Sequence, residues 1–274
     1  MEYGTIRCRT ALSPSRLPGL TYSLNPYFGC EHGCLYCYSR SVFRNEKIAR
    51  NWGTFVNAKS NIVEVLAREL PGKRKGVVGL STVTDPYQPV ESKLELTRSC
   101  LEVLAKHDFK ISIQTKSSLV LRDSDLISGP KFEVGVTITT LDPELARKLE
   151  PRACLPDERQ RTLEGYSERK VETWIFLGPI IPYVNDQPEN LERIIRVAKA
   201  TKSRLLFDKL NLRPWVFENL TPFLAKEAPQ ALDNIPSLLG QKSEYWQMFS
   251  ARIQSMCQDL GVRCEQAFPI TGLD

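Results

Sequence analysis

The sequence contains no uninterrupted run of about 18 apolar residues, the length that a membrane-spanning helix requires. The first 20 residues also lack the apolar core of a secretory signal peptide. Neither a membrane span nor export is supported, so we expect a cytoplasmic protein with no membrane partner. In a reducing compartment, the eight cysteines are expected as metal ligands or free thiols and not as a disulfide framework.

A fourth cysteine is missing where a closed zinc site would need one. Cys30, Cys34 and Cys37 stand in one short, glycine-interrupted stretch, whereas a structural zinc ion usually has four protein ligands. Thiolates favour iron–sulfur clusters, zinc or copper(I). A [4Fe–4S] cluster held by three cysteines keeps one iron open, which makes the site suitable for chemistry. One alternative is a zinc ion with His32 as the fourth ligand, which would strain the loop. Another is a disulfide between two of the cysteines, with the remaining thiol free.

The cysteine spacing and its surroundings resemble a known family. Cys30-x3-Cys34-x2-Cys37, with an aromatic residue before the third cysteine, is similar to the radical S-adenosylmethionine (SAM) enzymes. The longer string Asn25-Pro-Tyr-x-Gly-Cys-x-His-x-Cys-x-Tyr-Cys-Tyr resembles the branch related to spore photoproduct lyase, a DNA repair enzyme of spores. A second string, Thr-Asp-Pro-Tyr-Gln-Pro-Val-Glu at 84–91, is similar to one of the same branch. The resemblance covers roughly residues 10–215 and does not fix the substrate.

Strand-like and helix-like periods alternate along the chain from residue 21 to residue 213. Six strands separated by helices are typical of a parallel sheet with right-handed crossovers. The pattern alone does not separate a partial barrel from a doubly wound sheet. The resemblance implies an α/β fold, the partial (β/α)6 TIM-like barrel of radical SAM enzymes. The predicted strands are 22–24, 76–82, 109–115, 132–139, 171–177 and 204–210, and the predicted helices are 61–70, 91–107, 122–128, 143–149, 158–168 and 188–201.

Three parts are predicted along the chain, because 274 residues with 42% hydrophobic content suffice for one sizeable core. Residues 1–20 read as an irregular N-terminal arm, and residues 21–213 as the barrel. Residues 214–274 are predicted to form a helical C-terminal cap over the open side of the barrel, although simple packing is the alternative. Its helices are expected at 216–227 and 243–260, around a proline-containing connector and before a short apolar end at 264–270.

Polar residues follow the predicted strands, at the end where barrels place active sites. Ser81, Thr82, Thr84 and Asp85 come after the second strand, either as cofactor contacts or as a capping turn for the next helix. Lys116 follows the third strand, where the resemblance implies a lysine directed at the SAM carboxylate; a surface lysine is the alternative. The fourth strand adds Thr137 and Thr139 as candidate ribose or carboxylate contacts. Only alternate side chains of a strand face inward, and the sequence does not decide which alternate set does so here.

Four further cofactor contacts are implied by the resemblance. Tyr36 matches the aromatic position that packs near the adenine, or it fills the loop. Glu150, Arg152 and Arg159 resemble the Glu-Pro-Arg and downstream arginine of the branch. They are expected either to bind the SAM amine and steer an anionic substrate, or to form a loop-closing ion pair.

The sequence departs from the lyase at one position. The resemblance implies a cysteine three residues before the aspartate, which returns a hydrogen atom to the product radical. This chain has Thr82 there. A threonine O–H bond is far stronger than a thiol S–H bond, so Thr82 is unsuited to that step. Tyr38 and Tyr87 are our candidate catalytic residues, as alternative hydrogen-atom donors.

The function expected from these features is reductive cleavage of SAM for hydrogen-atom abstraction, with an electron donor such as flavodoxin or ferredoxin. A net charge of +5 is compatible with a nucleic-acid substrate but does not decide it. The basic residues at 40–50 are either a solvated helical face or an anion-binding rim. One alternative is a radical SAM maturase acting on a protein or peptide, with Cys154, Cys257 and Cys264 as possible ligands of a further cluster. Another is a zinc-binding nucleic-acid module.

Overall fold

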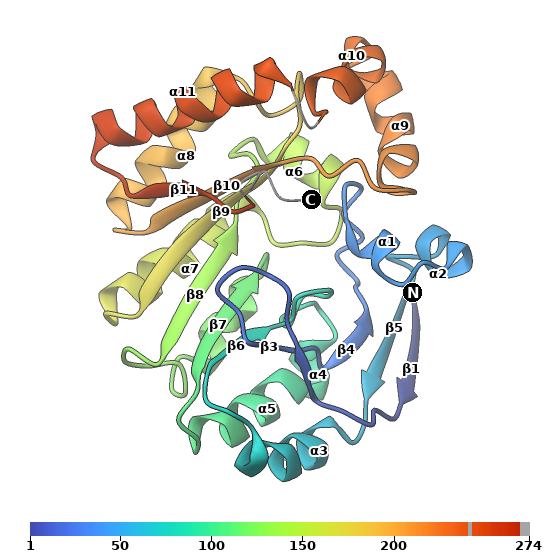
Figure 1. Ribbon diagram of the computed structural model, residues 1–274, viewed down its shortest axis with the longest axis vertical. Coiled ribbons are helices and arrows are strands. Elements are labelled where there is room, and N and C mark those ends of the chain that lie inside the picture. The colour runs from blue at the N-terminus through green and yellow to red at the C-terminus, as the bar shows by residue number, and fades with distance from the viewer. Residues whose placement is uncertain (241–242, 269–274) are drawn as a thin grey trace.

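The computed structural model describes residues 1–240 and 243–268, and its centre is an eight-stranded sheet (Figure 1). Seven of its strands are parallel and neighbour one another in sequence order, as βα units produce, and the first six of them along the chain are those of the predicted barrel. The predicted α/β partial barrel is therefore confirmed. These six strands are β3 (Tyr22–Leu24), β6 (Val77–Leu80), β7 (Lys110–Thr115), β8 (Phe132–Thr137), β9 (Glu172–Ile180) and β10 (Arg204–Lys209).

Most of the helices between these strands form where the periodicity predicts them. The predicted helix 91–107 is interrupted at Glu95, whose φ of 48° is left-handed. The helix predicted at 122–128 is replaced by an earlier 3-10 helix, because the Ser117 side chain caps it by accepting from Leu119 N. No helix in the described ranges is both long and apolar enough to cross a membrane. The helices are α3 (Ile62–Glu69), η1 (Leu70–Gly72), α4 (Glu91–Leu94), α5 (Leu96–Ala105), η2 (Ser118–Asp123), α6 (Pro143–Leu149), α7 (Pro156–Glu168) and α8 (Pro188–Ala200).

The C-terminal part contributes a strand to the large sheet as well as helices. It contains α9 (Val216–Glu227), α10 (Gln230–Leu238) and α11 (Glu244–Leu260), and then β11 (Cys264–Gln266), which extends the sheet parallel to β10. Helix α11 packs beside α8 (Figure 1). The connector predicted between two helices is itself the helix α10, since Pro229 stands at its N-cap, where proline is tolerated. The last residues of the expected apolar end, 269–270, lie outside the described residues.

The N-terminal arm is more regular than predicted. Strand β2 (Leu12–Pro14) pairs antiparallel with β3, and β1 (Glu2–Ile6) pairs parallel with β5 (Phe55–Lys59). Strand β4 (Tyr27–Gly29) completes a separate sheet in the order β1-β5-β4, next to α1 (Ser39–Val42) and α2 (Glu46–Arg50). Four of the five β1 residues are exposed, so the strand has no apolar alternation by which it could be recognised.

The large sheet separates an apolar layer from a polar interior. On β7, Ile111 and Ile113 are fully buried in the core under the helices. Full burial of such a side chain contributes about 1.5–3 kcal/mol. Alternation turns Gln114 and Lys116 to the opposite face, where they line a pocket together with Thr137 of β8. The sheet thus directs polar strand-end residues to one place.

Candidate active site

The three clustered cysteines and the ends of β6, β7 and β8 line one pocket. These are the carboxyl ends of parallel strands, where α/β barrels hold their active sites. Ten residues predicted from the sequence line it: Cys30, Cys34, Cys37, Tyr38, Ser81, Thr82, Thr84, Asp85, Lys116 and Thr137. The lining is completed by His32, Ser39, Val83, Gln114 and Thr115. The other six predicted residues do not line it: Tyr36, Tyr87, Thr139, Glu150, Arg152 and Arg159.

The two strings that carry the family resemblance form one hydrogen-bonded unit. Thr84 Oγ1 donates to the Gly29 carbonyl at 2.6 Å, directly before the first cysteine. Glu31 N donates to Gln88 Oε1 at 2.8 Å, directly after that cysteine. Gln88 Nε2 also donates to Thr84 Oγ1 at 3.0 Å, which ties the two contacts together. The turn after β6 therefore fixes the start of the cysteine loop.

Asn25 explains the first residue of the first string. Its Oδ1 accepts hydrogen bonds from the backbone amides of Thr82 and Val83, at 3.0 and 3.1 Å. A single side chain therefore satisfies two donors at the end of β6 and joins that turn to the segment leading into β4. Asparagine suits this position because its carbonyl oxygen has two lone pairs.

Arg152 holds the cysteine loop from outside the pocket. Its Nε donates to the Glu31 carbonyl at 2.5 Å, and its Nη2 donates to the Gly53 carbonyl. Gly33 has a φ of 62°, and a Cβ there would lie 2.9 Å from Arg152 Nη2. Glycine is therefore required both by the backbone and by the close guanidinium. Arg152 does not line the pocket, and its Nε and Nη2 are directed at loop carbonyls, so its role as a cofactor contact stays a prediction.

Asp85 is a buried acceptor inside the same unit. It accepts from Thr115 Oγ1 at 2.7 Å, from Lys116 N at 2.8 Å and from Tyr87 N at 2.9 Å. His32 Nδ1 lies 3.4 Å from its Oδ2. Burial opposes ionisation, but His32 and these donors outweigh it and lower the pKa of Asp85 to about 2. His32, the alternative zinc ligand, is thus engaged with a carboxylate.

Lys116 brings to the pocket an ammonium group whose donors are unpaired. In residues 1–240 and 243–268 its ammonium group has neither a hydrogen-bond acceptor nor an ion-pair partner within contact distance, and it lies 5.7 Å from the centre of the Tyr36 ring. Burial by itself would lower the pKa of Lys116, but the charges of Cys34, Glu150 and Asp85 raise it above its ordinary value. The side chain therefore stays protonated, and its donors are available to an anionic group of a ligand.

Glu150 and Arg159 form a fully buried ion pair behind the cysteine loop. Tyr36 donates its hydroxyl to Glu150 Oε1, and Thr139 Oγ1 donates to the same oxygen at 3.2 Å. Burial raises the pKa of Glu150, but Arg159 and Lys116 outweigh it and lower that pKa. Of the two roles considered for this pair, its geometry is that of the internal, loop-closing ion pair. Tyr36 and Thr139 are likewise bound to the protein itself.

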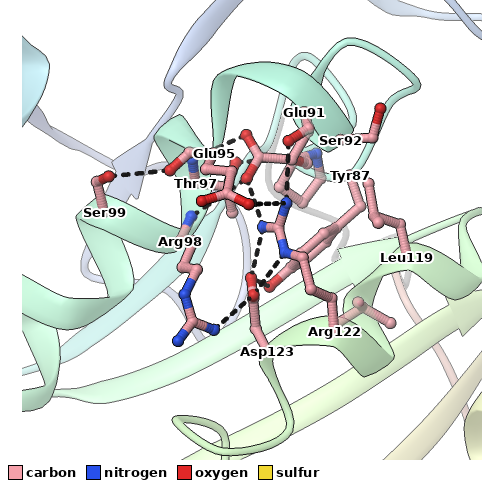
Figure 2. A network of polar contacts seen from close by, with 12 residues as sticks. Tyr87, Glu91, Ser92, Glu95, Thr97, Arg98, Ser99, Leu119, Arg122 and Asp123 are labelled. Atoms are coloured by element: carbon pink, nitrogen blue, oxygen red, sulfur yellow. Dashed lines mark hydrogen bonds and ion pairs between the residues drawn. The ribbon is translucent and has the colours of Figure 1, made fainter.

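Tyr87 belongs to a different polar network, which lies in the core (Figure 2). Its hydroxyl donates to Asp123 Oδ2 at 3.0 Å. Arg122 joins Asp123 to Glu91 by donating to Asp123 Oδ1 and Glu91 Oε1, both at 2.7 Å. Tyr27, which precedes the cysteine loop, donates to the second Glu91 oxygen. The Tyr87 ring is fully buried and does not line the pocket, so the structure does not bring this residue to the cysteines, and its role as a hydrogen-atom donor stays a prediction.

Tyr38 and Ser81 are two of the hydroxyl-bearing residues that line the pocket. The Tyr38 hydroxyl donates to the Thr82 carbonyl, next to the third cysteine. Ser81 is buried with a left-handed φ of 61°, and its Oγ has no partner in the described parts of the chain. An unpaired buried hydroxyl and a strained backbone both cost free energy, and such features concentrate at binding sites. Ser81 is therefore suited to contact a ligand.

The cysteines fit a cluster better than a single ion. All three line one pocket, and burial raises the pKa of Cys30 to about 12 and that of Cys34 still further, so a cationic metal is needed to hold them as thiolates. Within residues 1–240 and 243–268, no three His, Cys, Asp or Glu side chains converge as they would on one metal ion. Ligands of one zinc ion must meet at a point, whereas cysteines around a cluster bind different irons.

Sequence reasoning missed several residues of this site. Gln88 stands within the second string, but nothing in the string shows that its side chain turns toward the cysteine loop. Gln114 donates to Thr137 Oγ1 at 3.2 Å and lines the pocket. It was detectable, because it lies two residues before Lys116 on the same strand and therefore on the same face.

The sequence model of the radical SAM superfamily matches residues 24–197, and the chain belongs to this superfamily. Its members are enzymes that use SAM and a [4Fe–4S] cluster.

Two related proteins show how widely the sequence pattern extends. An uncharacterized protein of Methanocaldococcus jannaschii is 33% identical over 214 residues, which is 78% of this chain and 79% of that protein. An uncharacterized protein of Mycobacterium tuberculosis is 30% identical over 226 residues, which is 78% of this chain and 66% of that protein.

Solved structures share the fold. Spore photoproduct lyase complexed with dinucleoside spore photoproduct has a TM-score of 0.69 at 14% identity, covering 97% of this chain and 82% of the lyase. A radical SAM methyltransferase from Sphaerobacter thermophilus has a TM-score of 0.60 at 15% identity, covering 94% of this chain and 77% of that chain. At such identities the likeness establishes the partial barrel, and the reaction has to be argued from the site.

Proposed function

We propose that the chain binds a [4Fe–4S] cluster through Cys30, Cys34 and Cys37, and reductively cleaves SAM to abstract a hydrogen atom from a substrate. The observation that carries the proposal is that these three cysteines and Lys116 line one pocket. When bound, the cluster supplies the electron and an open iron for the methionine end of SAM. A flavodoxin or ferredoxin is the class of protein expected to deliver that electron.

The chain's own residues orient and shield the cofactor. The Lys116 ammonium is suited to the SAM carboxylate, since the group is held protonated and its donors have no acceptor in the described chain. The Ser81 and Thr82 hydroxyls line the same pocket and are suited to the ribose or the methionine end. Asp85 is ionised, and its carboxylate oxygens accept hydrogen bonds from Thr115 Oγ1, Lys116 N and Tyr87 N. We therefore propose that Asp85 positions the turns after β6 and β7.

For the substrate, we propose a nucleic acid and not the lyase's own lesion. The fold likeness includes a spore photoproduct lyase bound to a dinucleoside lesion, and the net charge of +5 does not oppose an anionic polymer. Thr82, which lines the pocket, replaces the thiol that the lyase-like chemistry needs. Tyr38 is the remaining candidate donor at the pocket. Radical attack on an intact or differently modified nucleotide is therefore favoured over repair of spore photoproduct.

The maturase alternative has less support. Cys257 and Cys264 are neighbours at the junction of α11 and β11, whereas Cys154 Sγ accepts from Ser118 N at 3.4 Å. These three cysteines therefore lie in two different places. They do not line one pocket, as Cys30, Cys34 and Cys37 do.

The test is an anaerobic assay of the reconstituted, dithionite-reduced protein. We expect 5′-deoxyadenosine from SAM without substrate, and more of it with the correct pool among DNA, RNA and cell extract. The Cys34→Ala variant is the control and should form none. Absence of 5′-deoxyadenosine from protein that holds a cluster would contradict the proposal. In the same assay, dinucleotide spore photoproduct should give little or no conversion to two thymines. Efficient multiple-turnover conversion would reject our argument from Thr82.

A further inference from the structure

Arg40 is a buried guanidinium that follows the third cysteine. It lies in α1 with 4% of its surface exposed, and its backbone N donates to the Cys37 carbonyl at 3.4 Å. Its Nη1 donates to the Ala49 carbonyl at 2.8 Å, at the end of α2. No carboxylate forms an ion pair with it among residues 1–240 and 243–268. Buried arginines almost always have an anionic partner, so this one lacks the group that would compensate its charge.

The unpaired donor of Arg40 is its Nε–H. That atom is buried and has no hydrogen-bond partner in the described ranges. Leaving a buried donor unpaired costs free energy, and the cost is larger when the group is charged. The helix that carries Arg40 begins two residues after Cys37, one of the three residues that would hold the cluster.

Neighbouring basic residues do not share this environment. Arg44, Lys47 and Arg50 are all exposed, and Arg50 is paired with Glu46 at 2.8 Å. Exposed charges are screened by salt and contribute little to a buried group. The basic stretch 40–50 therefore contains a solvated face and one buried cation. The sequence had suggested either a solvated helical face or an anion-binding rim for the whole stretch.

We propose that Arg40 is the counter-ion of the cluster site and raises the cluster's reduction potential. The inference rests on the proposed function, because it assumes the cluster. A cluster held by three thiolates is an anion, and one-electron reduction by the donor protein makes it more negative without forming or breaking a covalent bond. A buried cation stabilises the reduced form more than the oxidised form. Net charge and hydrogen bonds near the sulfurs are recognised determinants of such potentials.

The experiment is a redox titration of the reconstituted protein without substrate, followed by the absorbance of the oxidised cluster and the electron paramagnetic resonance signal of the reduced one. Arg40→Gln removes the charge but keeps an amide that can donate to Ala49. We expect the ratio of reduced to oxidised cluster at a fixed potential to fall about tenfold, which is about 59 mV for a one-electron couple. Arg40→Lys keeps the charge and should shift the potential by less than half as much. Arg44→Gln, the exposed control, should leave it unchanged.

The outcomes separate this inference from the proposed function. Wild-type protein that assembles no cluster would overturn the proposed function. A loaded Arg40→Gln variant with the wild-type potential would overturn only the role of Arg40. If Arg40→Gln holds no cluster while Arg40→Lys holds one near the wild-type potential, the charge is required and the inference is supported. If neither variant holds a cluster, the loss does not follow the charge at position 40 and the inference is rejected.

Discussion

The cysteine loop is held from two sides that differ in kind. On the side of β6, the turn at 81–91 reaches the loop through Thr84, Gln88 and Asp85, and every contact is a side-chain hydrogen bond or an ion pair. On the side of the C-terminal helices, Asn219 Nδ2 donates to the Leu35 carbonyl at 2.7 Å. Apolar packing provides the rest there, because Leu35 and Cys37 contact the core that contains α9.

The core residues that support the turn at 81–91 also differ in kind from those that support α9. Behind the turn, the network around Glu91 and Asp123 places several charged groups in the core with their partners satisfied (Figure 2). Behind α9 there are buried aliphatic side chains such as Val216 and Leu220. Satisfied polar networks fix one geometry, whereas aliphatic cores tolerate volume-conserving exchange. We infer that the turn at 81–91 sets the geometry of the cofactor site. The C-terminal helices are inferred to tolerate substitutions that conserve side-chain volume.

Removing a cysteine should have the largest effect. Cys30→Ala, Cys34→Ala and Cys37→Ala should each reduce iron from about four atoms per chain to near zero and abolish the brown absorbance, because three ligands leave no redundancy. Cys100→Ala is the control, since Cys100 is buried in the core of the β6 side and remote from the pocket lining. One zinc ion and no iron after anaerobic expression would show that the site is of the zinc class.

Breaking the polar network around Glu91 and Asp123 should have the next largest effect, a loss of folding stability. Glu91 accepts hydrogen bonds from Tyr27, Thr97 N, Arg98 N and Arg122. Both of its carboxylate oxygens therefore face hydrogen-bond donors. In Glu91→Gln the new amide must face one of those donors. We expect a loss of about 3 kcal/mol in the free energy of unfolding, measured by urea denaturation.

Glu95→Gln is the matched control for that variant. The Glu95 side chain is 56% exposed and lies 4.0 Å from Arg122, so its loss should change the stability by less than about 0.5 kcal/mol. Equal losses in the two variants would show that the buried network does not fix the turn.

Lys116→Ala separates cofactor binding from the rigidity of the turn. The variant should keep the cluster and bind SAM about 10- to 150-fold more weakly, since one charge-assisted contact contributes about 1.5–3 kcal/mol. The Lys116 side chain makes no hydrogen bond to the described protein, so stability should be little affected. Calorimetric titration of the loaded protein measures the affinity. An unchanged dissociation constant would remove Lys116 from the site.

The same contrast explains what could be read from the sequence. The six barrel strands were predictable because alternation and length identify buried parallel strands, and the cysteines because their spacing is specific. Side-chain direction after a strand ends was not predictable. Tyr87 and Gln88 are adjacent, yet one enters the core and the other the loop. Strands β1, β4 and β5 were missed because they are short or exposed and pair across many residues.

The smallest effect is expected on the second side, from Asn219→Ala. This variant loses one neutral hydrogen bond to the Leu35 carbonyl, which is worth about 0.5–1.5 kcal/mol, and leaves the aliphatic packing of α9 in place. Asn234→Ala is the control, because Asn234 is exposed and bonds only to Gln230 in its own helix. We expect Asn219→Ala to lower the unfolding free energy within that range and to keep the full iron content. If it instead lost iron as severely as the cysteine variants do, the C-terminal side would be as decisive for the cofactor as the turn after β6, and the distinction between the two sides would have to be abandoned.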